Sequence, residues 1–215
     1  LGADADALTA MPQVLKDEVR TRILDAALEV FARDGFAAAT MASIAKAAGV
    51  GAASIYRYYE SKDELFAAVI TPELTRRFEV LLDRRVSALA RNTLRGEPAD
   101  DAGGEMLKFW LDHRLAVVIL LDRAAGTPHA HYGEHFVDLL VKHTLAELRA
   151  THSGLAISAR ARFVLVAIFD NTRRILASIL AAHEKPADLR EAIEAFWSYQ
   201  VAGLRSFSRH LAEAE

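Results

Sequence analysis

Three histidines lie close together at positions 129, 131 and 135, and imidazole is a common ligand for transition metals. His131 and His135 are four residues apart, so a helix would place both rings on one face, as in zinc-binding helices. One hypothesis is therefore a metal-dependent all-helical enzyme built on His129, His131 and His135. No Glu-x-x-His pair or cysteine accompanies them, and no nucleophile–base–acid set or phosphate-binding loop is found. We therefore expect no metal, no cofactor and no catalytic residues.

A second pattern lies in residues 41–59, MASIAKAAGVGAASIYRYY, where two short helices are predicted to meet at a glycine turn. Ala45 is small enough for a close helix crossing, and Gly49 can adopt the left-handed backbone of such a turn. Ile44 and Ile55 supply apolar contacts. The spacing is typical of a helix-turn-helix, whose second helix enters the major groove of DNA. An ordinary helical hairpin is the alternative, because the Ala-x-x-x-Gly pattern alone is weak.

Helical periodicity predicts the elements that position these residues, and no strand alternation is convincing. The expected helices cover about residues 13–34, 41–48 and 52–59, and a fourth opens at Lys62. Thr71-Pro72 should kink or break this fourth helix, and apolar spacing then resumes through Leu89. Further helices are expected at about 105–125, 128–150, 158–183 and 188–210. Thr40 is the expected N-cap of the second helix, and Ser61 with Glu64 forms a capping box for the fourth. Thr127-Pro128 is expected to open another helix. Residues 96–104, GEPADDAGG, are predicted to form a loop.

The composition is that of an ordinary globular protein, with 52% hydrophobic and 26% charged residues among 215. The formal net charge is −3, and residues 13–70 hold seven Lys or Arg against eight Asp or Glu. Charge alone therefore does not indicate a nucleic-acid partner, although basic side chains cluster near the two-helix motif. Residues 1–12 do not resemble a signal peptide, and the apolar run at 115–121 is too short to span a bilayer. We expect a cytoplasmic protein without a membrane partner.

The stretch from residue 20 to residue 66 resembles the N-terminal domain of the tetracycline-repressor (TetR) family. It covers about a quarter of the chain, and the order and spacing of the matching residues are highly specific. The matching residues are Ile23, Ala26, Ala27, Phe31, Gly35, Phe36, Thr40, Ile44, Ala45, Ala48, Gly49, Val50, Ile55, Tyr56, Tyr59, Lys62, Leu65 and Phe66.

The resemblance implies an all-α fold with two functional parts. A flexible tail at 1–12 would precede a three-helix helix-turn-helix DNA-binding domain at 13–61. Residues 62–215 would form a helical ligand-binding and dimerisation domain. The implied function is a homodimeric repressor that a small-molecule effector releases from double-stranded operator DNA. A helical protein-interaction module without DNA affinity is a further alternative.

The resemblance also implies roles for single residues of the head. Thr40, Tyr56 and Lys62 would contact backbone phosphates, whereas Ser54 and Arg57 would face bases or nearby phosphates. Gly51, Ala52 and Ala53 depart from the family pattern, which often has Ser, a longer polar residue and Gly there. Base recognition would then depend on thymine methyl groups, Arg57 and DNA shape. The predicted DNA-binding residues are Thr40, Ala52, Ala53, Ser54, Tyr56, Arg57 and Lys62.

Two sets of residues with helical spacing are predicted sites of the body, with core packing as the simpler interpretation of each. Aromatic and polar side chains that share helix faces suggest an effector pocket. The predicted pocket residues are Trp110, His113, Val117, Tyr132, Phe136, Phe163, Ala167, Asn171 and Arg174. The last two helices are expected to pair with a second subunit in a four-helix bundle. The predicted interface residues are Phe169, Arg173, Leu176, Leu180, Ile193, Phe196, Trp197, Val201 and Leu204.

Overall fold

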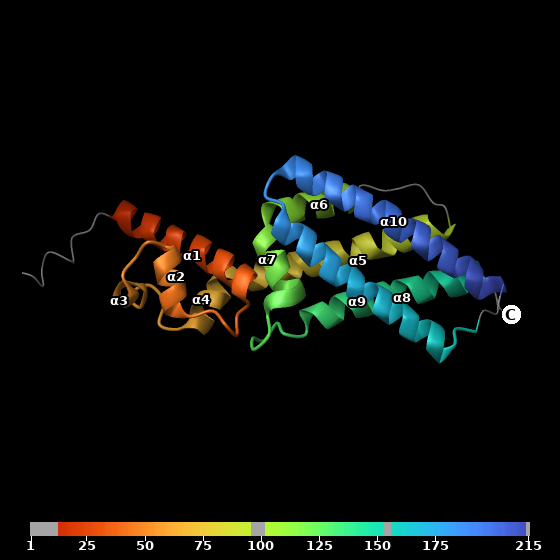
Figure 1. Ribbon diagram of the computed structural model, residues 1–215, viewed down its shortest axis with the longest axis horizontal. Helices are drawn as coiled ribbons and strands as arrows, with labels where there is room; N and C mark the ends of the chain where they lie inside the picture. The colour runs from red at the N-terminus through yellow and green to blue at the C-terminus, as the bar shows by residue number, and fades with distance from the viewer. Residues whose placement is uncertain (1–12, 96–101, 153–155, 214–215) are drawn as a thin grey trace, which may run out of the picture.

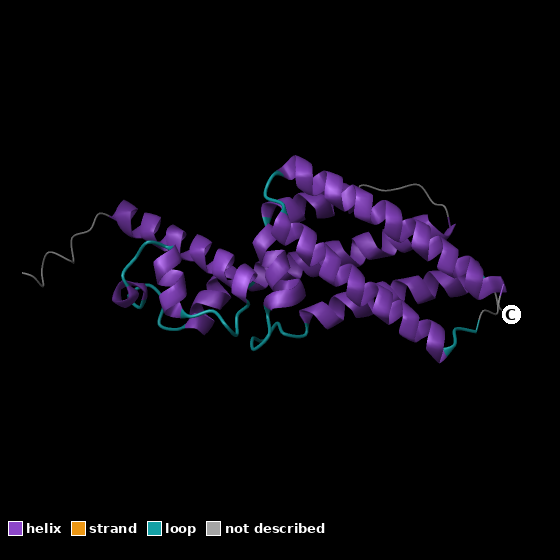
Figure 2. Cartoon of the chain, in the orientation of Figure 1, coloured by secondary structure: helices purple, strands orange, loops and turns teal. Residues whose placement is uncertain are grey.

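The computed structural model describes residues 13–95, 102–152 and 156–213, and all regular elements in these ranges are helical (Figure 2). The predicted all-α fold class is therefore confirmed. The elements are α1 (Gln13–Asp34), α2 (Met41–Ala47), α3 (Ala52–Ile55), α4 (Lys62–Val69), α5 (Pro72–Arg95), α6 (Ala102–Asp112), α7 (Arg114–Val118), the π-helical turn η1 (Ile119–Arg123), α8 (Tyr132–Thr151), α9 (Ala159–Ala182) and α10 (Pro186–Glu213).

Helices α1 to α4 form one end of an elongated molecule, and α5 to α10 form the other (Figure 1). We call these parts the head and the body. In the body, α8 packs between α5 and α9, and α10 lies against α5, α6 and α9. Helix α1 also contacts α7 and η1, so its C-terminal end joins the head to the body. One connected apolar core runs through both parts.

Aromatic side chains hold the head together. Phe31 of α1, Phe36 of the following loop and Phe66 of α4 have ring centroids 5.1 to 5.6 Å apart. All three are buried, together with Leu65 of α4. Helix α4 therefore packs on α1 within the head, and the predicted domain boundary between residues 61 and 62 stays a prediction.

Local capping explains where several helices begin and end. The Thr40 hydroxyl accepts a hydrogen bond from the Ser43 backbone N–H at 3.0 Å, and the Ser43 hydroxyl accepts one from the Thr40 N–H at 3.1 Å. Ser61 caps α4 by accepting from the Glu64 N–H at 3.1 Å. Gly35 ends α1 with a φ of +80°, a conformation that glycine adopts without steric cost. The predicted N-caps Thr40 and Ser61 are confirmed, but the Glu64 carboxylate accepts from the Glu60 N–H at 2.6 Å and does not close the predicted capping box.

Some predicted boundaries are wrong. The helix expected at 52–59 ends at Ile55, after which the backbone continues in turns that include a hydrogen bond from the Tyr58 N–H to the Ile55 carbonyl. The helix expected at 105–125 breaks at His113 and ends in η1. Thr127 opens no helix, because its hydroxyl donates back to the Ala124 carbonyl at 2.8 Å, and α8 begins only at Tyr132.

The loop predicted at 96–104 is only partly tested. Residues 96–101 lie outside the described ranges, whereas residues 102–104 belong to α6. The tail predicted at 1–12 also lies outside these ranges.

Candidate functional site

The two helices of the motif meet at a glycine turn, as the sequence predicts, although the second is shorter than expected. Ile44 and Ala45 of α2 and Ile55 of α3 are buried and fasten both helices to the core. Gly49 has a φ of +66°, which makes the sharp turn between them. The Val50 N–H then donates to the Ala45 carbonyl at 2.9 Å. The motif is therefore a rigid unit whose second helix has a fixed orientation.

The outward face of α3 and of the turn after it is exposed. Ala52, Ala53 and Arg57 are exposed, the Tyr56 ring is 55% exposed, and Ser54 is half-buried. Small side chains at the start of α3 would let its backbone approach a partner surface closely. The tyrosine and the arginine carry a hydroxyl and a guanidinium, which are groups that bind phosphate or base edges.

Lys62 has a structural role that the sequence did not indicate. Its Nζ donates to the Phe36 carbonyl at 2.6 Å and to the Ala39 carbonyl at 2.9 Å. The same ammonium lies 4.3 Å from the centroid of the Phe36 ring. Two of its three N–H groups are thus used to fix the loop between α1 and α2. Only the third N–H group would remain for the predicted phosphate contact of Lys62.

Arg20 is a further positioning residue of the head. Its Nε donates to the Tyr59 hydroxyl at 3.2 Å, and its guanidinium lies 5.9 Å from the centroid of that ring. Tyr59 is 2% exposed and belongs to the core. The contact joins the first turns of α1 to the segment after α3. The 39-residue separation explains why sequence spacing could not reveal it.

A chain of hydrogen bonds connects α9 of the body to the head. Arg173 of α9 donates to the Leu121 carbonyl in η1 at 2.5 Å and to Asp122 at 3.0 Å. The Arg123 carbonyl, at the end of η1, accepts from the Phe36 N–H of the head at 3.0 Å. Gly133 makes this packing feasible, because a Cβ there would lie 2.7 Å from the Leu121 carbonyl oxygen.

Five of the predicted pocket residues lie in or beside the packed interior of the body. Phe78 stacks on Phe109 and on Tyr132, with ring centroids 5.6 and 5.9 Å apart, and the Tyr132 hydroxyl donates to the Thr75 carbonyl at 3.0 Å. Burial raises the pKa of the Tyr132 hydroxyl. The buried or half-buried predicted residues are Trp110, His113, Val117, Tyr132 and Phe136. They belong to the core, not to the cavity described below.

The two predicted faces of α9 are interchanged in the structure. The face assigned to the pocket is at the surface, and it carries Phe163, Ala167, Asn171 and Arg174. The face assigned to a second subunit is buried within the chain, and it carries Phe169, Arg173, Leu176 and Leu180. Of the predicted interface residues on α10, Ile193, Phe196 and Leu204 are also buried, whereas Trp197 and Val201 are half-buried. Side chains already packed inside one chain cannot also pack against another.

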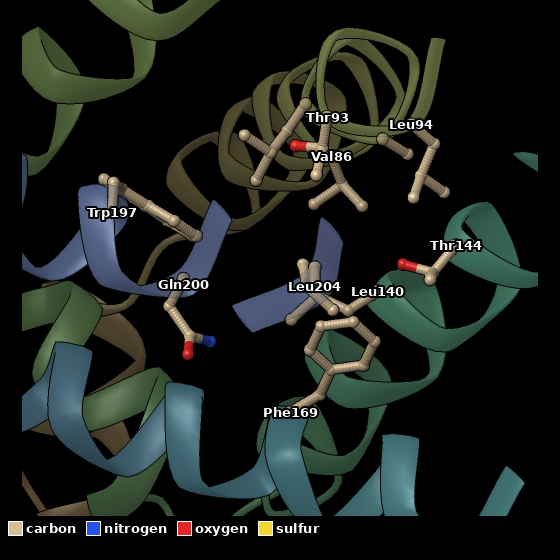
Figure 3. A pocket seen from close by; sticks show the side chains of 11 residues that line it. Val86, Thr93, Leu94, Leu140, Thr144, Phe169, Trp197, Gln200 and Leu204 are labelled. Carbon is tan, nitrogen blue, oxygen red and sulfur yellow. The ribbon is translucent and has the colours of Figure 1, made fainter. Parts of the chain in front are cut away.

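A small, partly open cavity lies between α5, α8, α9 and α10 (Figure 3). Its lining is apolar except for Thr93, Thr144 and Gln200. The lining residues are Val86, Leu89, Ala90, Thr93, Leu94, Leu140, Thr144, Phe169, Trp197, Gln200 and Leu204. The sequence prediction had assigned Phe169, Trp197 and Leu204 to the subunit interface and had missed the other eight.

The three clustered histidines surround one aromatic ring. The rings of His129, His131 and His135 have their centroids 6.0 to 6.2 Å from that of Tyr132. Burial lowers the pKa of His129, with a further contribution from His131. Within the described ranges, no group of three or more His, Asp, Glu or Cys side chains is arranged to hold a metal ion. The metal-dependent enzyme is therefore not favoured. In the same ranges, no helix is both long and apolar enough to cross a membrane.

The sequence profile of the family described as "Bacterial regulatory proteins, tetR family" matches residues 23–69. The HTH-type transcriptional regulator BetI of Rhizobium meliloti is 36% identical over 111 residues, which are 47% of this chain and 53% of that protein. SrpR of Pseudomonas putida, also an HTH-type transcriptional regulator, is 44% identical over 54 residues, or 25% of each chain. The chain thus spans about half the length of these curated relatives, or less.

Similarity to a solved structure extends over nearly the whole chain. A TetR-like transcriptional regulator from Rhodococcus sp. RHA1 aligns over 94% of this chain and 98% of its own, with a TM-score of 0.50. The sequence identity is 24%, so the similarity supports the fold of head and body together.

Proposed function

Since the chain belongs to the TetR family of bacterial regulatory proteins, we propose that it is a transcriptional repressor that binds operator DNA as a homodimer. A small molecule bound in the body would release it from the operator. It would act in the cytoplasm, where the bacterial chromosome lies.

The exposed face of α3 is the observation on which this proposal rests. It stands on a helix-turn-helix fixed by Gly49 and by the buried Ile44 and Ile55, within the segment that matches the family. An α-helix fits the major groove of B-DNA. Tyr56 and Arg57 follow α3 directly and would reach phosphates or base edges, while Ala52 and Ala53 would allow close approach.

The homodimer would form through the outer faces of α9 and α10. Phe163 on α9 is 73% exposed and Tyr199 on α10 is 72% exposed, and Val164 and Val166 add further exposed apolar surface. Large exposed apolar side chains grouped on neighbouring helices are typical of a subunit interface. A two-fold dimer would present two α3 helices to half-sites about 34–36 Å apart.

Release would follow from the hydrogen-bonded connection between body and head. A molecule that favours one arrangement of α9 would act on η1 through Arg173, and on the head through the bond between Arg123 and Phe36. The occupied body would then favour a spacing of the two heads that does not fit the operator. A molecule that binds both arrangements equally well would change nothing.

The test is fluorescence anisotropy with the DNA upstream of the protein's own gene, at several salt concentrations. Arg57→Ala should weaken binding by about 5- to 150-fold if the guanidinium contacts a base, and should reduce the salt slope by about one if it contacts a phosphate. Arg149→Ala is the matched control, because it removes an exposed arginine from α8, outside the proposed subunit interface. Equal affinity and equal salt slope for the wild type and both variants would contradict a DNA-binding role for this face.

A further inference from the structure

The cavity between α5, α8, α9 and α10 contains a buried hydroxyl group without a partner. Thr93 is 4% exposed, and its Oγ1 has no hydrogen-bond partner in the described part of the chain. Its backbone carbonyl is already occupied by Arg205, whose Nε donates to it at 3.1 Å. A buried hydroxyl that is left unbonded is unfavourable, so an occupant with a matching polar atom gains free energy there.

The remaining lining restricts the chemistry of that occupant. All eleven lining side chains are uncharged, and eight of them are apolar. The amide of Gln200 already donates a short hydrogen bond to the Thr172 hydroxyl, outside the lining. A charged molecule would lose its hydration without gaining a counter-ion. The lining thus fits a small, neutral, mostly apolar molecule with one hydroxyl or carbonyl group.

The cavity is also close to the surface. Trp197 and Leu89 line both the cavity and an open groove between α5 and α10, whose other side chains include Arg85 and Glu194. The indole of Trp197 is half-buried and stands at the edge of the cavity, with the Arg85 guanidinium 5.9 Å from its ring centroid (Figure 3). Trp197 therefore stands between the cavity and the groove, and its fluorescence can report on occupancy of the cavity.

From these observations we propose that this cavity is the effector site, and that the effector is a neutral apolar molecule whose single polar group bonds to the Thr93 hydroxyl. The inference rests on the proposed function of a ligand-responsive regulator. The lining of this cavity contains none of the pocket residues that the sequence predicted. Phe169 lines the cavity and lies one helical turn before Arg173, so an occupant would touch the helix that is bonded to η1.

Three probes of similar size test the chemistry: p-cresol, toluene and 4-methylbenzoate. Titration calorimetry gives their affinities for the full chain. The emission of Trp197, excited at 295 nm in a Trp110→Phe background, reports whether they bind beside it. We expect p-cresol to bind about 3- to 10-fold more tightly than toluene, because it can bond to the Thr93 hydroxyl. The charged 4-methylbenzoate should bind at least about 10-fold more weakly than p-cresol.

Two variants locate the site. Thr93→Val keeps the shape of the side chain and should reduce the affinity for p-cresol to that for toluene, leaving toluene unaffected. Ala90→Leu fills the cavity and should abolish binding of both, whereas Ala146→Leu at an exposed position of α8 should not. The assignment would be overturned if neither p-cresol nor toluene binds. It would also be overturned if Thr93→Val and Ala90→Leu both leave the affinities at their wild-type values. If Ala90→Leu fails to fold, the Thr93→Val comparison alone decides.

A separate measurement distinguishes this inference from the proposed function. Operator affinity is measured with and without saturating p-cresol. Unchanged operator affinity despite cavity binding would contradict the ligand response and leave the cavity assignment intact. If p-cresol still releases the Ala90→Leu variant from the operator, the cavity assignment is contradicted but the proposed ligand response is not.

Discussion

Arg173 of α9 and Leu121 of η1 are joined by a hydrogen bond of 2.5 Å from the guanidinium to the backbone carbonyl. Arg173 is 9% exposed, and it also pairs with Asp122 and Asp170. One buried cation thus connects the helix that lines the cavity to the turn that contacts the head. The neighbouring Arg174 pairs with the same Asp170 but is exposed.

These neighbouring arginines should differ strongly in their effect on stability. Arg173→Met leaves the Leu121 carbonyl without its donor, and we expect it to lower the free energy of unfolding by about 2–3 kcal/mol. Arg174→Met removes only an exposed ion pair and should cost less than about 1 kcal/mol. Urea unfolding measures both. Equal effects would mean that the bond to Leu121 contributes nothing to stability.

Two glycines of the body should respond to alanine in opposite directions. A Cβ on Gly133 would lie 2.7 Å from the Leu121 carbonyl oxygen, so Gly133→Ala should destabilise the chain by about 1–3 kcal/mol through overpacking. Gly203 lies in the interior of α10 with nothing within 4 Å of such a Cβ. Gly203→Ala should stabilise by up to about 1 kcal/mol through helix propensity. Thermal or urea unfolding gives the sign of each change in the free energy of unfolding. If Gly133→Ala leaves this free energy unchanged, the close approach of α8 to η1 is refuted.

The exposed face of α9 should control the oligomeric state. Phe163→Glu would place a charge within the proposed interface, and we expect it to weaken dimerisation at least about 100-fold in sedimentation equilibrium. Val80→Glu on α5 is the control, because Val80 is also an exposed apolar residue at 63%. A Phe163→Glu protein that dimerises like the wild type would move the interface elsewhere.

Lys62 should affect DNA binding without contributing a phosphate contact. Lys62→Met removes the bonds to the Phe36 and Ala39 carbonyls, so the loop before α2 should lose order and operator affinity should fall. The slope of log affinity against log salt should stay at the wild-type value, since each phosphate contact contributes about 0.9 to that slope. A slope reduced by about one would instead support the phosphate contact that the sequence predicted.

Stability should decrease as the pH falls through the histidine range. Burial lowers the pKa of both His113 and His129 below the ordinary value of 6.5. The unfolded chain therefore binds protons at a pH where these folded histidines are still neutral. The stabilisation is fully present above about pH 6.5 and is lost as the pH drops below it.

The measurement is urea unfolding between pH 8 and about pH 5.5, which stays above the carboxyl range. His113→Gln and His129→Gln should each flatten the pH dependence. An equal decrease in the wild type and in both variants would show that other groups titrate.

The head could be predicted from the sequence because its signals are local. Thr40 and Ser61 cap helices through backbone groups three residues away, and Gly49 marks the turn by its own backbone conformation. The role of Lys62 could not be predicted in this way. Its partners Phe36 and Ala39 lie 26 and 23 residues earlier, and a lysine beside a DNA-binding motif suggests a phosphate.

The body was harder to predict because both faces of α9 carry apolar residues. Helical periodicity groups Phe163 with Ala167 and Phe169 with Arg173, but it does not say which group faces the core. The packing of α7, α8 and α10 against α9 decides this, and it buries the Phe169 face. Thr93 gave no signal at all, because its importance lies in a missing hydrogen-bond partner.

The π-helical turn η1 contains one more residue than a turn of α-helix, so its length can change by single insertions or deletions. Each residue of an α-helix turns the chain by about 100°, so deleting one would rotate Arg123 and the residues after it relative to α7. Homologues could therefore diverge in the angle between head and body through such length changes alone. An alignment gap at residues 119–123 would then carry more information about operator spacing than a substitution on α3.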